Sequence, residues 1–152
     1  MKALSLLLLL TVCAATAPAR VPTGVLKTSA LGGDTAAMVV VGSRYLHGDG
    51  EKEDLVEAER WYRMAAVRKD FDGVHGMGTV YVNRKDYVTA YAWFALYADE
   101  EAGLAEARDD VWSVIPANKQ IAAIQKAKSL KEAIPKEQAE LLLRHIQAAQ
   151  KK

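Results

Sequence analysis

The sequence predicts an all-α fold, built as a stack of about three helical hairpins with a further helix capping the C-terminal end. A pattern of small, glycine and aromatic residues occurs twice in the middle of the chain, and within each copy the apolar residues follow helical spacing. Proline also stands where two later helices would begin, at Pro116 and Pro135. The expected units span about residues 34–69, 70–101 and 102–133, followed by a terminal helix at 135–150.

The first half of the repeat consists of a small residue, an apolar–glycine pair and a tyrosine, at a spacing that lines one face of a helix. In the first copy these are Ala37, Val41-Gly42 and Tyr45, and 36 residues later they are Gly73, Met77-Gly78 and Tyr81. Glycine inside a helix costs about 1 kcal/mol relative to alanine. We therefore expect a neighbouring backbone to pack closely against Gly42 and Gly78.

The second half of the repeat begins with an aspartate and continues with an alanine, an aromatic pair and a further pair. These positions are Asp54, Ala58, Trp61-Tyr62 and Ala65-Ala66, and 32 residues later Asp86, Ala90, Trp93-Phe94 and Tyr97-Ala98. Asp54 and Asp86 stand where a helix N-cap belongs. Each copy is therefore predicted to be a pair of short antiparallel helices, which must stack on its neighbours to bury its apolar faces.

These positions resemble the Sel1-like repeat family, a relative of the tetratricopeptide repeats, whose pattern is A-x3-L-G-x2-Y-x2-G, then an aspartate, then A-x2-W-Y/F-x2-A-A. The resemblance covers residues 34–99, with departures in the second copy at Gly73, Arg84 and Tyr97. A weaker third unit follows, with Ala107-Arg108 at the apolar–glycine place. The resemblance implies a right-handed α-solenoid that holds a protein or peptide partner and needs no cofactor.

The N-terminal residues predict export. Residues 1–19 combine Lys2, an apolar stretch and the small residues Ala17 and Ala19, which is typical of a secretory signal peptide cleaved after Ala19. Such a stretch is too short to span a membrane, and no later segment is apolar enough to do so. We expect residues 20–33 to be a linker or short N-terminal segment, and the mature chain to reach the bacterial periplasm or be secreted.

The single cysteine, Cys13, lies inside the predicted signal peptide. A lipid anchor on Cys13 is the disfavoured alternative, because Val12 precedes it where a lipoprotein signal has a small residue. If the peptide is removed after Ala19, the mature chain has no cysteine and no disulfide.

Charge and motifs restrict the function. The chain has 20 Lys and Arg against 19 Asp and Glu, which disfavours a nucleic-acid partner. Its three histidines lack the spacing of metal ligands, and no nucleophile–base motif occurs, so we predict no metal, cofactor or catalytic residue. The sequence thus favours an adaptor or scaffold. The alternatives are a cell-envelope enzyme acting on cell-wall or β-lactam chemistry, and a structural or inhibitory subunit of an envelope assembly.

In tetratricopeptide relatives the first helix of each hairpin lines a concave groove, and the resemblance implies the same surface here. Counted from the apolar–glycine pair, the groove positions are Val39, Ser43 and His47, then His75, Thr79 and Asn83, and finally Asp109 and Trp112. Trp112 has no equivalent in the other units. It is either an anchor for the partner or a residue that packs against the C-terminal helices.

Overall fold

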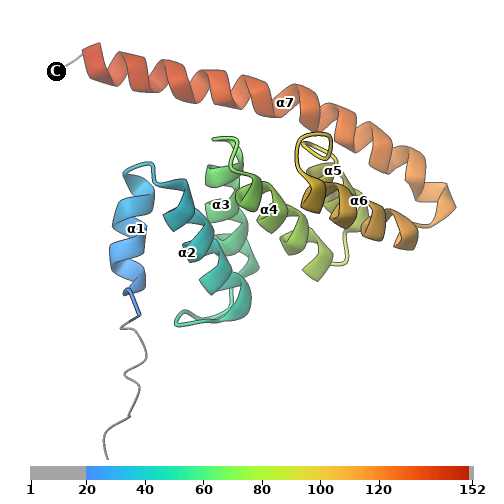
Figure 1. Ribbon diagram of the computed structural model, residues 1–152, viewed down its shortest axis with the longest axis horizontal. Coiled ribbons are helices and arrows are strands. Elements are labelled where there is room, and N and C mark those ends of the chain that lie inside the picture. Colours follow the sequence, from blue (N-terminus) through green and yellow to red (C-terminus); the bar gives the residue numbers. More distant parts are fainter. Residues whose placement is uncertain (1–19, 151–152) are drawn as a thin grey trace, which may run out of the picture.

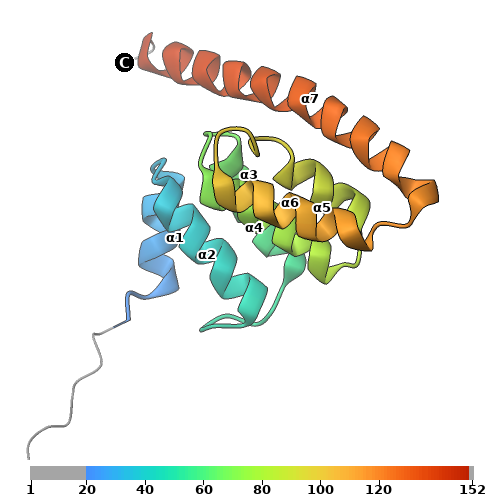
Figure 2. The same cartoon turned by 45° about the vertical axis from the view of Figure 1, so that its right-hand side comes forward.

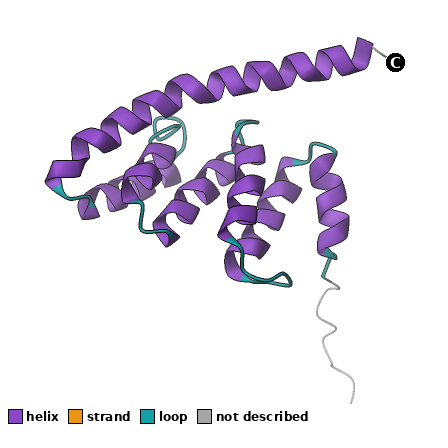
Figure 3. Cartoon of the chain, turned by 180° about the vertical axis from the view of Figure 1, so that it is seen from behind, coloured by secondary structure: helices purple, strands orange, loops and turns teal. Residues whose placement is uncertain are grey.

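The computed structural model describes residues 20–150, and for 145, 146 and 148–150 only the backbone. Within this range seven helices follow one another and no strand occurs (Figure 3). They are α1 (Thr23–Leu31), α2 (Thr35–His47), α3 (Leu55–Ala66), α4 (Phe71–Asn83), α5 (Tyr87–Phe94), α6 (Ala102–Val114) and α7 (Ala117–Gln150).

Helices α1 to α6 form a row in which neighbours along the chain pack together, and α7 packs on α5 and runs back along one side of that row (Figure 1). The stack confirms the predicted α-solenoid. The predicted signal peptide at residues 1–19, with Cys13, lies outside the described residues.

Acidic side chains start five of the helices. Asp54 accepts hydrogen bonds from the backbone N–H groups of Val56 and Glu57, at 2.8 and 3.1 Å, and Asp86 accepts one from Thr89 at 3.1 Å. Both predicted N-caps are thus confirmed. The same role falls to three residues that the sequence analysis did not single out: Asp34, Asp70 and Glu101. Because each cap satisfies backbone donors that the helix leaves free, the chain turns at defined points.

The glycines of the repeat accommodate aromatic rings. A Cβ atom added to Gly42 would lie 3.0–3.1 Å from the ring of Tyr62, and one added to Gly76 would overlap the same ring. Gly78 stands against Phe94 in the same way. The expectation of a close backbone at Gly42 and Gly78 was therefore wrong, since a glycine on the first helix makes room for the second aromatic residue of the following helix.

Gly73 is the position where a backbone does approach closely. A Cβ atom there would lie 2.6 Å from Cβ of Ala65 and 2.7 Å from the backbone nitrogen of Ala66. The repeat pattern has alanine at this place, and the tighter contact between α3 and α4 explains why glycine replaces it.

The first aromatic residues of the two copies, Trp61 and Trp93, are almost fully buried. A polar contact joins the two units at their edge, where the Glu59 carboxylate accepts hydrogen bonds from Tyr81, at 2.7 Å, and from Arg84. Arg84 also donates to the carbonyl oxygen of Leu55. Arg84, which stands where the repeat pattern has glycine, thus links the end of α4 to α3.

Residues 20–33 are not a linker, because Thr23–Leu31 form α1, which packs on α2. The side chain of Arg44 on α2 is buried and donates hydrogen bonds to the carbonyl oxygen of Val21 and the hydroxyl of Thr23. Arg20 forms an ion pair with Asp49. These contacts between segments far apart in the sequence dock a helix whose own apolar periodicity is weak.

The C-terminal end also differs from the prediction. Pro135 does not begin a new helix but lies inside α7, which continues from Ala117 to Gln150. Contacts on both sides of the proline explain this continuity: Ile134 is buried in the main core, Glu137 pairs with Arg63, and Gln138 donates to the Tyr97 hydroxyl at 3.1 Å. α7 packs on α5 of the second unit rather than chiefly along α6, and its Glu137 links it to Arg63 of the first unit.

We expect the substitution Gly73→Ala to lower the free energy of unfolding by about 2 kcal/mol, because the new methyl group would press on the α3 backbone. Gly24→Ala is the matched control, since a Cβ atom there meets nothing within 4 Å. It should leave stability unchanged or raise it by about 0.5–1 kcal/mol. Urea denaturation followed by circular dichroism measures both. Equal stability of Gly73→Ala and the wild type would contradict the close approach.

Glu59 should make stability depend on pH. Burial alone would raise the pKa of its carboxyl, but hydrogen bonds from Tyr81 and Arg84 outweigh burial and hold the pKa below the ordinary value of 4.5. Its contribution is therefore present above pH 4.5 and is lost as the pH falls through the lower folded-state pKa.

Glu59→Gln should cost about 1.5 kcal/mol at pH 7, because Arg84 loses a charged acceptor, and should flatten the acid limb of the stability profile. Glu53→Gln, at an exposed loop position, serves as the control for loss of one carboxylate. A Glu59→Gln profile parallel to that of the wild type below pH 4.5 would show that the contact does not set the acid response.

Candidate functional site

The first helices of the units, α2, α4 and α6, lie in sequence along one side of the molecule, with α4 in the middle (Figures 1 and 2). Each buries one side toward α3 or α5 and leaves polar side chains on the other. All eight predicted groove residues belong to these three helices. None of the eight is fully buried; they are Val39, Ser43, His47, His75, Thr79, Asn83, Asp109 and Trp112.

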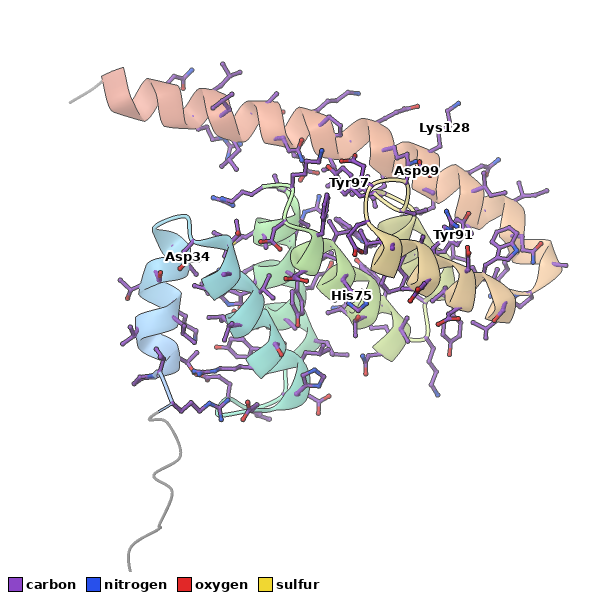
Figure 4. The ribbon with its side chains drawn as sticks, viewed as in Figure 1. Asp34, His75, Tyr91, Tyr97, Asp99 and Lys128 are labelled. Carbon is purple, nitrogen blue, oxygen red and sulfur yellow. The ribbon has the colours of Figure 1, made fainter. Side chains whose placement is uncertain are left out.

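Three of the predicted residues form a row on α4. The Thr79 hydroxyl donates to the carbonyl oxygen of His75 at 3.0 Å, and the Asn83 amide donates to the carbonyl oxygen of Thr79 at 2.9 Å. The His75 ring lies 5.4 Å from the ring of Phe94, at an interplanar angle of 56°. Figure 4 shows His75 on the open side of α4. These three side chains are therefore held in place and remain accessible.

The predicted residues on α2 contribute less to this surface. Val39 is half-buried and packs against the core on both sides of α2. Ser43 lies beside the Tyr62 hydroxyl, whose pKa is raised by burial and lowered in part by Ser43. Only His47, at the C-terminal end of α2, is exposed.

On α6, Asp109 is exposed and pairs with Arg108, with 2.7 Å between nitrogen and oxygen. Hydrogen bonding to Arg108 lowers the pKa of the Asp109 carboxyl. Trp112 is half-buried, packs against the core, and lies with its ring 5.1 Å from that of Tyr91 on α5. Trp112 thus packs on α5.

An open hollow of about 670 Å³ lies between the N-terminal ends of α4 and α6 on this side. Of the predicted groove residues, only His75 lines it. The other lining residues are Lys69, Asp70, Phe71, Asp72, Glu101 and Gly103. These six residues were not predicted from the sequence, because they stand at or before the helix starts, ahead of the repeat positions from which the groove was counted. The aspartate and glutamate caps were the available signal.

The walls of the hollow are fixed by neighbouring contacts. Lys69, in a left-handed backbone conformation with φ of 61°, forms an ion pair with Glu100 at 2.7 Å. That hydrogen bond raises the pKa of the Lys69 ammonium group. The ring of Phe71 packs at 5.6 Å on Tyr97, which Figure 4 places near the α5–α6 loop. The hollow therefore combines rigid aromatic surface with charged side chains of both signs.

An imidazole and a hydroxyl lie close together on this surface. The Thr79 oxygen lies 3.5 Å from Nδ1 of His75, but its hydroxyl proton is donated to the His75 carbonyl oxygen. The pair is therefore not arranged as a nucleophile and its base. Among the described residues, no three potential ligands from His, Cys, Asp and Glu converge as a metal site would require.

No protein-family model matches the chain, and no curated protein matches its sequence. Among solved structures the chain is similar to a protective antigen present in uropathogenic Escherichia coli strains, which displays an SLR fold, with a TM-score of 0.65 and 24% identity. The similarity covers 79% of this chain and 27% of the antigen, so the chain corresponds to about a quarter of that protein. At this identity the likeness shows the fold alone: the chain has the Sel1-like repeat fold.

Proposed function

We propose that the chain is an exported adaptor or scaffold that holds a protein or peptide partner on the side formed by α2, α4 and α6. The observation that carries the proposal is the row of His75, Thr79 and Asn83 beside the open hollow. Thr79 and Asn83 are ordered by hydrogen bonds to the α4 backbone and His75 by its contact with Phe94, yet none of the three is buried in the hydrophobic core. A surface that is already ordered loses little entropy on binding.

The catalytic alternative is less well supported by this surface. A hydrolase of cell-wall or β-lactam bonds needs an activated nucleophile or a metal-bound water, and Thr79 is the only hydroxyl on α4 close to an imidazole. A structural or inhibitory subunit would use the same binding surface as an adaptor. Export rests on the predicted signal peptide, and the bacterial periplasm or the medium is the proposed location. None of the helices within residues 20–150 combines the length and apolarity of a membrane span.

Site-specific photo-cross-linking tests where the partner binds. A photoreactive amino acid replaces Thr79 in one variant. In the other variant it replaces Val56, which lies on α3 and is 69% exposed. We expect a discrete adduct with an envelope protein from position 79 only, because position 79 lies on the proposed surface. An adduct from position 56 alone, or equal adducts from both, would contradict the assignment.

We expect Trp112 to stabilise the fold rather than anchor the partner, because it packs on Tyr91 and the core. Trp112→Ala should lower the free energy of unfolding by about 2 kcal/mol, less than for a fully buried tryptophan. Yield of the adduct from position 79 should stay the same under conditions where the variant is folded. Trp112→Phe, which keeps a ring against Tyr91, is the control. Loss of the adduct with unchanged stability would instead make Trp112 an anchor.

A further inference from the structure

The hollow between the starts of α4 and α6 combines an excess of carboxylate oxygens with aromatic surface. We propose that it takes an arginine side chain from an extended segment of the partner protein. The inference rests on the proposed function, because it names the chemistry of the segment that the α2–α4–α6 side would hold.

The carboxylates that line the hollow have oxygen atoms free to accept further hydrogen bonds. Asp70 and Glu101 each use one carboxylate oxygen to cap a helix, accepting from Gly73 at 3.0 Å and from Leu104 at 2.7 Å. The second oxygen of each carboxylate makes no hydrogen bond within the described part of the chain. Asp72 is exposed and has no ion pair there. Three carboxylates from two successive units therefore line one hollow with acceptors to spare.

The hollow carries a net negative charge, because one lysine and three carboxylates line it. Its lysine, Lys69, is already paired with Glu100, and its Nζ lies 5.4 Å from the centre of the Tyr97 ring. The positive charge of Lys69 is thus compensated from outside the hollow, whereas the charge of Asp72 is not. Residues 99–110 also contain six acids, of which three, Asp99, Glu100 and Asp109, are paired with lysine or arginine. Glu106 and Asp110 on α6 have no ion pair within the described part of the chain, so the neighbouring surface of α6 is acidic too. Such a surface attracts a cationic segment and repels an anionic one.

The aromatic rings of the hollow favour arginine over other cations. Phe71 is held against Tyr97, and His75 is held against Phe94. Two rings with fixed positions thus line the same hollow as the carboxylates. A guanidinium group can stack flat on an aromatic face while its in-plane N–H groups donate to two carboxylates, whereas an ammonium group donates from a single nitrogen and has no planar face to stack. The volume of about 670 Å³ is enough for a side chain together with part of its backbone.

The test uses three fluorescein-labelled peptides of equal length, in which glycine alternates with arginine, lysine or glutamate. Fluorescence anisotropy with the purified protein measures binding at near-physiological salt. We expect the arginine peptide to bind about threefold more tightly than the lysine peptide, and the glutamate peptide not to bind. Added salt should weaken the arginine complex.

Two charge-matched variants locate the binding. Asp72→Asn removes the free carboxylate and should weaken the arginine peptide about fivefold. Glu53→Gln, in the exposed loop after α2, removes the same charge away from the hollow and should change the affinity less than about twofold. Asp72→Lys places a cation at the same point and should weaken binding further. Circular dichroism checks that each variant is folded, and chemical shifts of the Gly103 amide report occupancy of the hollow.

Four results would overturn the inference. Equal weakening by Asp72→Asn and Glu53→Gln would mean diffuse surface charge, and equal binding of the arginine and lysine peptides would mean that the rings do not contribute. Spermine binding as tightly as the arginine peptide would mean a site for small cations. An arginine peptide that fails to bind, beside a partner still cross-linked from position 79, would refute the arginine assignment and leave the adaptor standing. Absence of any adduct from position 79 would count against the adaptor itself.

Discussion

The ring of Tyr62 lies between two helices that belong to different units, and the stack depends on this contact. Gly42 on α2 and Gly76 on α4 both leave room for the ring, so α3 is held between the first helices of successive units. Phe94 meets Gly78 in the second unit. Each glycine lowers the intrinsic stability of its helix, and the close packing of a large aromatic side chain offsets that cost. A larger residue at Gly76 would push the two units apart, and a larger residue at Gly42 would push α2 away from α3 within the first unit.

This packing also determines which side of the molecule can bind. Gly73, Gly76 and Gly78 turn one side of α4 toward α3 and α5, and the other side carries His75 and Thr79 in the open. The helix caps also contribute to this side, because Asp70 and Glu101 bring charged groups to the starts of α4 and α6. The side that carries the proposed function is therefore a consequence of how the core is packed, and core and surface use different faces of the same helix.

The ends of the stack are closed in two different ways. At the N-terminal end, α1 covers α2 and is held by Arg44, a buried cation whose partners are a backbone carbonyl and a hydroxyl. At the other end, α7 crosses α5 and reaches back to Arg63 in the first unit through Glu137. Repeat proteins need such terminal elements because an inner unit exposes apolar surface when it lacks a neighbour. Here α7 also contacts both the first and the second unit.

The amino-acid sequence by itself determined the helices of the two repeat units, their antiparallel pairing and their aspartate caps. These features arise from interactions within a few residues, namely helical apolar spacing and hydrogen bonds from a side chain to the next turn. Only the tertiary structure decided that residues 23–31 form a helix, that α7 runs through Pro135, and that the glycines face rings. It also brought Asp72 and Glu101 to one hollow. The contacts of Arg44, Tyr62 and Glu137 join residues 14 to 74 positions apart in the sequence. Such contacts leave no periodic signal along the chain, because their energy depends on how whole helices pack.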